Sequence, residues 1–444
     1  MTITTRFAPS PTGTLHVGNI RTALHNWLWA HKYGGRFLLR IDDTDAERSK
    51  EAFVAGIRTD LAWLGLAADG ETRQSARFPL YEARFDALRD AGRVYPAYET
   101  AQELDLKRKV LLGRGLPPVY DRAALALTDA DRAALEAEGR RPHWRFRLDH
   151  DAPIAWHDLI RGDQRFDPRT MSDPVIRRAD GSWLYMLPSA IDDVDMGITH
   201  VVRGEDHVSN TAAQIQMFAA LGAPAPAFAH EALLVGSEGK LSKRLGSLGV
   251  EAFREAGYEP AAIAALLARI GTSQPVEPIA DIRLLAAGFD FGHCGRAPAR
   301  FDEAELAQLN ARIVHQLDHT AVADRLPAGI DSAGWEAIRP NLGTVREAAD
   351  WWQVVEGSVD APAFSAEDIA YIGAAADAAA GLDWSTDPWR ALTESLKAAT
   401  GRRGKALFLP LRQALTGRDH GPDMAALLPL IGRERAIERL RTAG

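Results

Sequence analysis

Two short stretches carry the residues with the clearest chemical potential. In the first, RFAPSPTGTLHVGN at 6–19, Ser10, Thr12 and Gly13 lie in a rigid turn rich in Pro and Gly, and His16 stands where a helix begins. The N–H groups at a helix N-terminus attract phosphate, and a histidine there donates a hydrogen bond to phosphate oxygens. A lone histidine at such a position is more often only a helix cap, so this stretch alone leaves both interpretations open.

The second stretch is a basic loop, GKLSKR at 239–244, which follows an apolar strand pattern. Lys240 and Lys243 stand three residues apart beside Ser242 in a loop that contains glycine. Such a mobile pair of cations suits a phosphoryl group whose negative charge grows in a transition state. The loop is not a P-loop, because Gly-x-x-x-x-Gly-Lys-Ser/Thr is absent. Taken alone, solvated surface lysines are the commoner explanation.

The elements around these stretches alternate between strand and helix. Residues 2–9 favour a strand stopped by prolines, 16–35 a helix that ends at Gly34-Gly35, 36–45 a buried strand and 49–66 a second helix. This alternation predicts a parallel sheet with crossover helices. Ligands of such sheets bind beyond the carboxyl ends of the strands, which is where the first stretch lies.

The pattern of predicted helices and strands changes twice along the chain. Charged helical stretches and short strands between about Val94 and Leu184 indicate an inserted α+β domain, and strand patterns vanish after about residue 305. The fold class predicted is therefore α/β: a Rossmann-type parallel-sheet domain with an inserted α+β domain and an all-helical C-terminal region. The expected ranges are 1–95 and 185–305 for the two halves of the Rossmann domain, 96–184 for the insertion and 306–444 for the helical region.

Composition agrees with a cytoplasmic protein of several domains. The 444 residues are 46% apolar and 25% charged, and no apolar run approaches the ~18 residues that a membrane span requires. The N-terminus does not resemble a secretory signal, and the single Cys294 excludes an internal disulfide and a multi-cysteine zinc site. The net charge of −8 argues against nucleic acid, but residues 401–444 hold nine Lys/Arg against four Asp/Glu.

Together, the two stretches resemble the two signatures of class I aminoacyl-tRNA synthetases. HVGN is similar to their HIGH, and KLSKR to their KMSKS. More specifically, five motifs in order resemble bacterial glutamyl-tRNA synthetases: RFAPSPTGTLHVGN, LLRIDDTDAERS, GITHVVRGEDHVSNT, KLSKRLG and PLRQALTG. The resemblance runs from residue 6 to the C-terminus and thins at 100–145 and 275–400.

The resemblance implies a two-step ligase reaction. L-Glutamate and Mg-ATP give glutamyl-adenylate and pyrophosphate, and the glutamyl group then passes to the terminal adenosine of tRNA(Glu); tRNA(Gln) stays open as a second acceptor. The inserted domain is expected to bind the acceptor end, and the helical region the anticodon arm, with its basic residues on phosphates. A monomer is expected.

The family's site residues carry over to matching positions. The catalytic positions are His16, Lys240, Ser242 and Lys243. Those expected at ATP are Pro11, Thr12, Gly13, His16, Gly18, Asn19 and Lys243. Those expected at glutamate are Arg6, Ala8, Ser10, Asp42, Tyr185, Ser189 and Arg203. Arg6 and Arg203 would fork onto a carboxylate and reject the neutral amide of glutamine, with structural ion pairs as the alternative role.

Three positions depart from the family pattern. Asn19 stands where HIGH ends in His, and Asp42, expected near the α-ammonium group, stands where many relatives have Glu. The stretch VYPAYET at 94–100 has no cysteine where some relatives hold zinc, so we predict no zinc and no other metal site in the protein.

Four alternatives fit less well. A paralogue that glutamylates a modified tRNA base would lack the residues after 305, and glutaminyl-tRNA synthetases typically show PEPNG and end in β-barrels. A non-catalytic RNA-binding descendant would have lost His16 or Lys243, which are both present. A Rossmann dehydrogenase would carry Gly-x-Gly-x-x-Gly after its first strand, where this chain has a Pro-rich turn.

Overall fold

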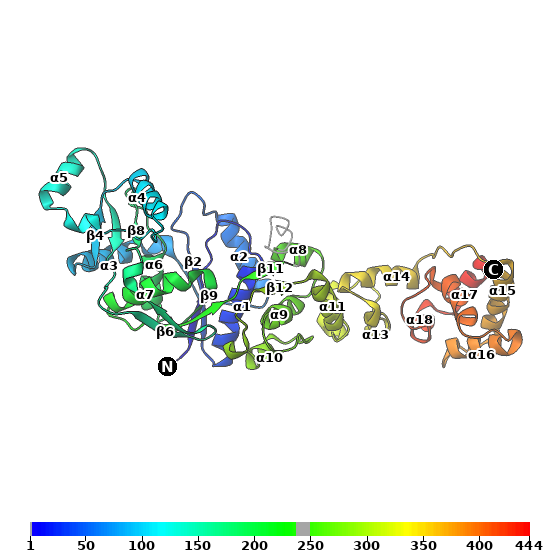
Figure 1. The fold of residues 1–444 in the computed structure, drawn as a ribbon. Coiled ribbons are helices and arrows are strands. Elements are labelled where there is room, and N and C mark those ends of the chain that lie inside the picture. The colour runs from blue at the N-terminus through cyan, green and yellow to red at the C-terminus, as the bar shows by residue number, and fades with distance from the viewer. Residues whose placement is uncertain (1, 237–248) are drawn as a thin grey trace. The chain divides into compact units, whose positions relative to one another are not determined.

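The computed structural model describes residues 2–236 and 249–444, which form two compact units (Figure 1). The units are Met1–Arg254 with Ile263–Asp302, and Glu255–Ala262 with Glu303–Gly444. Each unit is built around its own buried hydrophobic residues.

The first unit begins with a parallel sheet. Its elements are β1 (Thr4–Phe7), α1 (Val17–Lys32), β2 (Arg36–Ile41), α2 (Glu51–Trp63), β3 (Gly70–Arg73) and α3 (Phe78–Asp90). β1 is buried along its whole length and β2 everywhere except Arg36, as expected for strands of a parallel sheet covered on both faces. β1 and β3 pair in parallel with the two edges of β2. The sequence pattern therefore predicted β1 and β2 as strands and β2 as buried, whereas β3 was not predicted.

Helix α1 is the crossover between β1 and β2. It buries Ile20, Leu24 and Leu28, which recur at helical spacing. Gly34 follows the helix with a φ of +62°, a left-handed conformation that favours glycine. A Cβ on Gly35 would lie 2.1 Å from the carbonyl oxygen of Ile3. The predicted helix stop at these two glycines is confirmed.

A second group of elements in this unit includes a four-stranded sheet and a two-stranded sheet of β11 and β12. The elements are β6 (Ile154–Asp158), β7 (Gly162–Phe166), α6 (Met186–Asp195), β9 (His200–Gly204), α7 (Val208–Ala220), β10 (Ala227–Glu231), β11 (Leu234–Gly236), α8 (Val250–Glu255), α9 (Pro260–Arg269), α10 (Ile282–Ala287) and β12 (Ala299–Phe301). The order is β7-β6-β10-β9, with β6, β10 and β9 parallel. The N–H of Thr199 donates to the carbonyl of Thr4 at 2.9 Å, so β9 starts beside β1. The predicted α/β class with parallel strands is confirmed.

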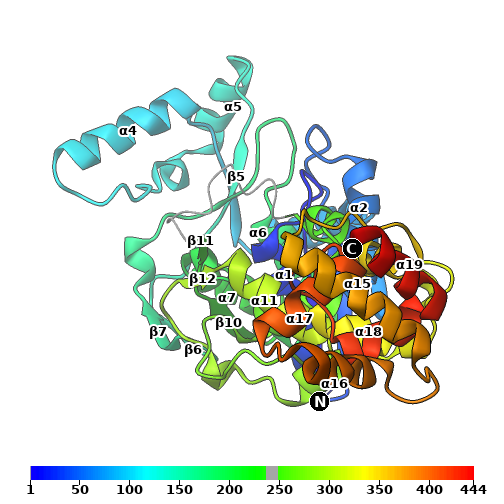
Figure 2. The ribbon, with the colours of Figure 1, turned by 90° about the vertical axis from the view of Figure 1, so that its right-hand side faces the viewer.

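The insertion contains a separate antiparallel sheet. Its elements are β4 (Val94–Ala97), α4 (Ala101–Gly113), α5 (Asp129–Ala137), β5 (His143–Phe146) and β8 (Val175–Arg177), with the strand order β4-β5-β8. Figure 2 shows α4 and α5 away from β6, β7 and β10. Residues 154–166 were expected in this insertion, but β6 pairs with β10, and Leu159 N–H donates to the Phe228 carbonyl at 2.8 Å. We therefore assign them to the four-stranded sheet of β6, β7, β9 and β10, while the other expected boundaries stay predictions.

The second unit is helical. Its helices are α11 (Glu303–Val314), α12 (His319–Val322), α13 (Ser332–Ile338), α14 (Ala348–Glu356), α15 (Ala366–Gly381), α16 (Pro388–Thr400), α17 (Lys405–Thr416), α18 (Met424–Ile431) and α19 (Arg433–Ala443). They pack around buried side chains that include Trp335, Leu411 and Leu427. No strand occurs in the described residues after 302. The predicted all-helical C-terminal region is confirmed.

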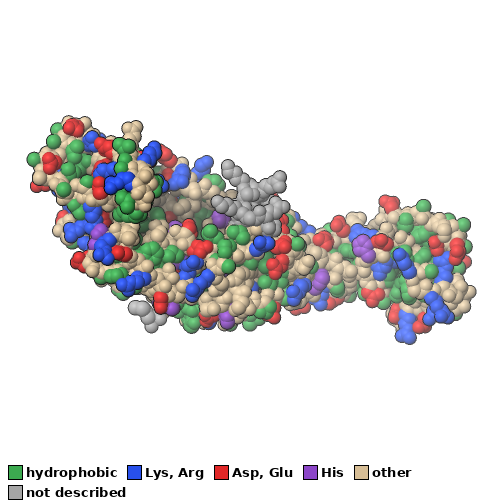
Figure 3. Space-filling model, viewed as in Figure 1, with side chains coloured by type: hydrophobic (Ala, Val, Ile, Leu, Met, Phe, Trp, Pro, Cys, Tyr) green, Lys and Arg blue, Asp and Glu red, His purple; other side chains and the backbone are tan. Residues whose placement is uncertain are grey.

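Most basic side chains of residues 401–444 have partners within this unit. Arg402 forms ion pairs with two acidic side chains of α15, and the buried Arg439 donates to backbone carbonyls, including that of Leu415 at 2.7 Å. Arg403 and Lys405 are exposed and form no ion pair or hydrogen bond with a described residue. Figure 3 shows acidic and basic side chains interspersed over the unit. Much of the local positive charge therefore stabilises the fold.

Candidate active site

A cavity of about 750 Å³ lies where the strands of the first unit end. Its walls come from the residues that follow β1, the first turn of α1, the ends of β2 and β9, and residues 232–234 after β10. Parallel sheets bind their ligands at this edge, because helix N-termini and loop side chains converge there.

The turn before α1 is held by backbone hydrogen bonds. Thr12 N–H donates to the Ser10 carbonyl at 2.8 Å, and Lys50 N–H donates to the Pro11 carbonyl at 3.1 Å. Pro11 itself is buried and does not line the cavity, whereas Thr12 and Gly13 do. Pro11 therefore shapes the turn that places the N-terminus of α1 against the cavity.

His16 is the N-cap of α1 and also lines the cavity. Its Nδ1 accepts a hydrogen bond from the N–H of Gly18 at 3.1 Å, and the side chain of Asn19 accepts one from the His16 N–H at 3.3 Å. Desolvation lowers the pKa of His16 below its ordinary value, so the ring is neutral near pH 7. Because Nδ1 is an acceptor, the ring proton is on Nε2, where it can be donated to a ligand. The helix cap and the phosphate donor are therefore compatible roles.

Gly18 makes room for this imidazole. A Cβ at position 18 would stand 3.0 Å from Cε1 and 3.1 Å from Nδ1 of His16. A larger residue would therefore displace the ring or break the capping hydrogen bond.

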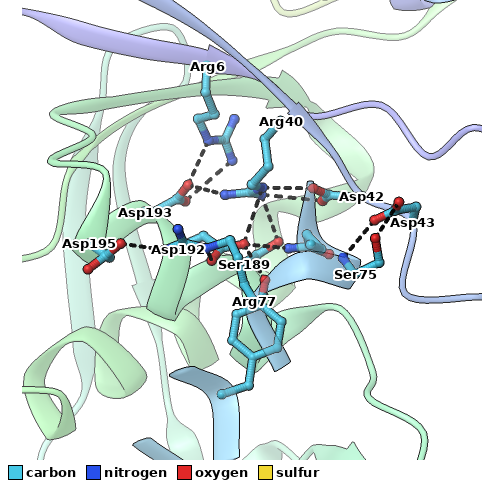
Figure 4. A network of polar contacts seen from close by, with 12 residues as sticks. Arg6, Arg40, Asp42, Asp43, Ser75, Arg77, Ser189, Asp192, Asp193 and Asp195 are labelled. Atoms are coloured by element: carbon cyan, nitrogen blue, oxygen red, sulfur yellow. Dashed lines mark hydrogen bonds and ion pairs between the residues drawn. The ribbon is translucent and has the colours of Figure 1, made fainter. Parts of the chain in front are cut away.

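A buried network of arginines and aspartates forms the floor of the cavity (Figure 4). The carboxylate of Asp193 accepts hydrogen bonds from Arg6 Nε at 3.0 Å and from Arg40 Nη1 at 2.7 Å. Arg40 also donates to Asp42 at 2.7 Å and to the Ser189 hydroxyl at 3.0 Å. Arg6 thus has a carboxylate partner inside the protein, which is the structural role weighed against direct ligand binding.

The network sets the charge of its acids. Burial would raise the pKa of Asp193, but Arg6 and Arg40 hold that pKa below its ordinary value. Burial raises the pKa of Asp42 to about 6 against the opposing effect of Arg40. Asp42 lines the cavity, so at neutral pH it offers an ionised carboxylate there.

Arg203, at the carboxyl end of β9, forms its hydrogen bonds within the described residues with neutral side chains. Its Nη2 donates to Thr211 Oγ1 at 2.5 Å, and its Nε to His230 Nε2 at 3.4 Å. No acidic side chain in the described part of the chain forms an ion pair with it, in contrast to Arg6. Desolvation, followed by the charge of Arg6, lowers the pKa of Arg203 to about 10, so the group stays cationic at neutral pH. Arg203 lines the cavity and is suited to an anionic ligand group.

The cavity brings together most residues that the sequence singled out. Twelve of them line it: Arg6, Ala8, Ser10, Thr12, Gly13, His16, Gly18, Asn19, Asp42, Tyr185, Ser189 and Arg203. Pro11 stands behind the lining, and Lys240, Ser242 and Lys243 lie outside the described residues.

Sequence reasoning missed several residues that shape the cavity. Arg40 is a charged residue inside the apolar strand RFLLRI, and Asp193 belongs to the otherwise largely apolar helix MLPSAIDDVD. Such buried charges in apolar elements are rare unless paired, which is the signal that could have identified them. His207 lines the cavity and contacts the Tyr185 hydroxyl through Nδ1 at 3.3 Å, together with the side chain of Asn210.

Among residues 2–236 and 249–444, no three His, Cys, Asp or Glu side chains are grouped so as to hold a metal ion. Within the same ranges, no helix has both the length and the apolar character that crossing a membrane requires. The expectation of no zinc stays a prediction.

Two family profiles together cover nearly the whole chain. Residues 2–305 match the catalytic domain of tRNA synthetases class I (E and Q), and residues 312–444 match an anticodon binding domain. The chain belongs to the class I tRNA synthetases of the E and Q family. The resemblance found in the five motifs is confirmed, and the two profiles meet near the junction between the two units of this synthetase.

The synthetase is also similar to individual proteins over its full length. It is 73% identical over 441 residues to glutamate–tRNA ligase 1 of Rhizorhabdus wittichii, with 99% of each chain covered. It is 70% identical over 444 residues to glutamate–tRNA ligase 2 of Sphingopyxis alaskensis, with both chains fully covered. A crystal structure of a glutamate tRNA ligase from Elizabethkingia meningosepticum, 27% identical, superposes with a TM-score of 0.86, covering 100% of this chain and 99% of that one.

Proposed function

We propose that this synthetase is a glutamate–tRNA ligase, which activates L-glutamate with ATP and transfers the glutamyl group to tRNA(Glu). The activity named for its full-length relatives supports this function. One observation supports it most directly: Arg203 and the N-terminus of α1 line the same cavity. Arg203 forms no ion pair with an acidic side chain among the described residues, so its charge is available to an anionic ligand.

The first step is an in-line displacement at phosphorus. An oxygen of the glutamate α-carboxylate attacks the α-phosphorus of ATP, the bond from that phosphorus to the bridging oxygen breaks, and pyrophosphate leaves. Such steps depend mainly on positioning and on stabilisation of charge. The backbone N–H groups in the first turn of α1 that the His16 cap leaves free, together with the Nε2 proton of His16, would stabilise the phosphates. Mg²⁺ would arrive on the ATP phosphates and add positive charge.

The charge on the departing pyrophosphate needs further cations. We assign that role to Lys243, supported by Lys240 and Ser242, whose placement lies outside the described residues. This assignment comes from the KLSKR motif, since two lysines in a short loop can follow the charge as it moves.

Selection of glutamate would rest on Arg203. Its planar guanidinium can form two parallel hydrogen bonds with the side-chain carboxylate. We assign this contact to Arg203 in preference to Arg6, because Arg6 already shares Asp193 with Arg40. Glutamine would place a neutral amide there and leave the guanidinium uncompensated, which polar sites reject strongly. Asp42 would accept the α-ammonium group.

In the second step, a hydroxyl of the terminal adenosine of tRNA attacks the carbonyl carbon of glutamyl-adenylate. The bond from that carbon to the phosphate oxygen breaks, and AMP leaves. The insertion around β4, β5 and β8 would hold the acceptor end, and the second unit the anticodon arm. Its match to an anticodon binding domain supports the latter role.

We assign Arg403 and Lys405, which are exposed and form no ion pair or hydrogen bond with a described residue, to tRNA phosphates. Replacing both Arg403 and Lys405 with Ala should reduce the magnitude of the slope of log affinity against log salt by roughly 1.4–1.8, since each phosphate contact contributes about 0.7–0.9. Arg283→Ala, which changes an exposed side chain paired with Asp281 in the first unit, is the control. An unchanged slope in the double variant would remove these residues from the interface.

A cytoplasmic monomer is the simplest form of such an enzyme. Light scattering of the purified chain should give a mass near 48.4 kDa. A mass twice as large would contradict the monomer.

The function is tested at Arg203. Arg203→Lys keeps the positive charge but loses the planar pair of donors that a guanidinium offers to a carboxylate. The KM for glutamate should therefore rise about tenfold or more, while the KM for ATP stays unchanged. The control is Arg36→Lys at the exposed start of β2. A glutamate KM equal to that of the unmodified enzyme would exclude Arg203 as the contact for the side-chain carboxylate.

A further inference from the structure

Behind Arg203 lies a row of three fully buried polar side chains: Asp158 on β6, Thr211 on α7 and His230 on β10. Each is 0% exposed, and none of them lines the cavity. We call them the Asp158–His230–Thr211 row. Any effect they have on a bound ligand must therefore pass through Arg203 or through its neighbours.

Asp158 fixes the orientation of His230. One carboxylate oxygen of Asp158 accepts from His230 Nδ1 at 2.5 Å, and the other accepts from the backbone N–H groups of Arg161 at 2.9 Å and His230 at 3.2 Å. Burial would raise the pKa of Asp158, but the hydrogen bonds from His230 and Arg161 lower it. The acid is therefore ionised, and the imidazole proton lies on Nδ1.

This tautomer turns an acceptor toward Arg203. With the proton on Nδ1, Nε2 of His230 carries a lone pair, and it lies 2.8 Å from Thr211 Oγ1 and 3.4 Å from Arg203 Nε. Thr211 Oγ1 accepts from Arg203 Nη2 at 2.5 Å, so its own proton points to His230 Nε2 or to the His207 carbonyl at 3.2 Å. Two nitrogens of the guanidinium are thus held by neutral acceptors.

Stability alone does not account for the row. The free-energy cost of removing an acid and an imidazole from water is about as large as the free energy gained from their attraction. Apolar side chains of similar volume therefore often stabilise a core equally well. Yet β6 and β10 place Asp158 and His230 between apolar neighbours such as Ile154 and Phe228. The row orients the guanidinium of Arg203 through neutral acceptors, so it does not neutralise the charge of Arg203. An acid placed directly on Arg203 would hold it more strongly but would compete with an anionic ligand.

We propose that Asp158, His230 and Thr211 are positioning residues that orient Arg203 for the side-chain carboxylate of glutamate and leave its charge available to that ligand. The inference rests on the proposed function, because it names the ligand group that Arg203 receives. It adds the three residues that determine the orientation of the Arg203 guanidinium.

The test uses Thr211 in the full-length enzyme. Thr211→Val keeps the shape of the side chain and removes the hydroxyl, so Arg203 loses an acceptor, whereas Thr211→Ser keeps the hydroxyl. In aminoacylation of tRNA(Glu) at saturating ATP, the Val variant should raise the KM for glutamate about tenfold to a hundredfold, the range for a hydrogen bond to a charged group. Its kcat and its KM for ATP should change little, and the Ser variant should behave like the unmodified enzyme.

L-Glutamine separates positioning from general damage. It lacks the side-chain carboxylate, so its inhibition constant against glutamate should be the same for Thr211→Val and for the unmodified enzyme. Asp158→Asn, which removes the charge that fixes the imidazole, should repeat the selective loss and provides a second variant if Thr211→Val does not fold. An unchanged KM for glutamate in a folded variant, or an equal weakening of glutamate and glutamine, would overturn the proposal. Failure of the unmodified enzyme to charge glutamate would instead refute the proposed function.

Discussion

The Nδ1 atom of His16 accepts a hydrogen bond from the backbone N–H of Gly18 at 3.1 Å, so one imidazole both caps α1 and keeps its proton on Nε2. The two roles can be separated. His16→Asn retains a strong N-cap but has no group at the position of Nε2. We expect kcat to fall about a hundredfold, the effect of losing one donor to a developing charge, with an unchanged melting temperature. His16→Ala should lose both activity and about 1 kcal/mol of stability. Steady-state aminoacylation and thermal unfolding measure the two effects, and a fully active Asn variant would leave His16 as a cap only.

Gly18→Ala should impair the enzyme by displacing the imidazole of His16. The new Cβ would stand 3.0 Å from Cε1 of His16, and the ring would have to move. Gly56→Ala on α2 is the matched control, because no heavy atom lies within 4 Å of its added Cβ. The control should stabilise the protein by up to about 1 kcal/mol through helix propensity and keep full activity. Equal activities of the two variants would show that the ring position is unimportant.

The activity should decline in mild acid because of Asp42. Its pKa is raised to about 6 by burial, so the carboxylate is ionised above that pH and becomes neutral below it. If Asp42 holds the α-ammonium group, kcat/KM for glutamate should be flat above about pH 7, reach half its plateau near pH 6 and fall further below that. Asp42→Asn should be weak at all pH values and lack this decline, whereas His16→Asn should keep it. The same decline in Asp42→Asn would assign the titration to another group.

Asp193 should matter more for stability than its neighbour Asp195. Asp193 is 3% exposed and pairs with both Arg6 and Arg40, so Asp193→Asn removes the ion-pair partner that the described residues give Arg6 and leaves Arg40 with Asp42 and Asp192. We expect a loss of about 3–5 kcal/mol in the free energy of unfolding of the first unit, measured by denaturant titration. Asp195, 46% exposed beside Arg77, should cost less than about 1 kcal/mol when changed to Asn. Similar losses in both variants would contradict the network's buried character.

Local patterns were enough to predict much of the site. The apolar periodicity of α1, the Pro-Gly turn and Gly34 determine where the helix begins and ends, and they place His16 at the edge of the sheet. The all-helical second unit followed from the loss of strand patterns. Such features depend on neighbouring residues in the chain, which a single sequence displays.

Long-range pairing could not be read in the same way. Arg40 and Asp193 are 153 positions apart, and nothing near either residue names its partner. The sequence pattern predicted that β6 belongs to the insertion, and only the pairing of β6 with β10 shows that it is part of the four-stranded sheet with β9. Likewise, the charge excess of the last helices suggested a binding face, but Arg402 and Arg439 are used within the fold. The sequence shows which side chains are charged, but it does not show which group each of them pairs with in the folded protein.

Charging of purified tRNA(Glu) with labelled glutamate or labelled glutamine tests the proposed function most directly, with tRNA(Gln) as a parallel acceptor. If Arg203 selects the side-chain carboxylate, glutamate should be attached to tRNA(Glu) and glutamine should be rejected by a factor of about 10⁴ or more. Glutamate on tRNA(Gln) as well would define a broader choice of tRNA with the same amino-acid pocket. Transfer of glutamine at a comparable rate, or no charging with glutamate, would contradict the function proposed for this cavity.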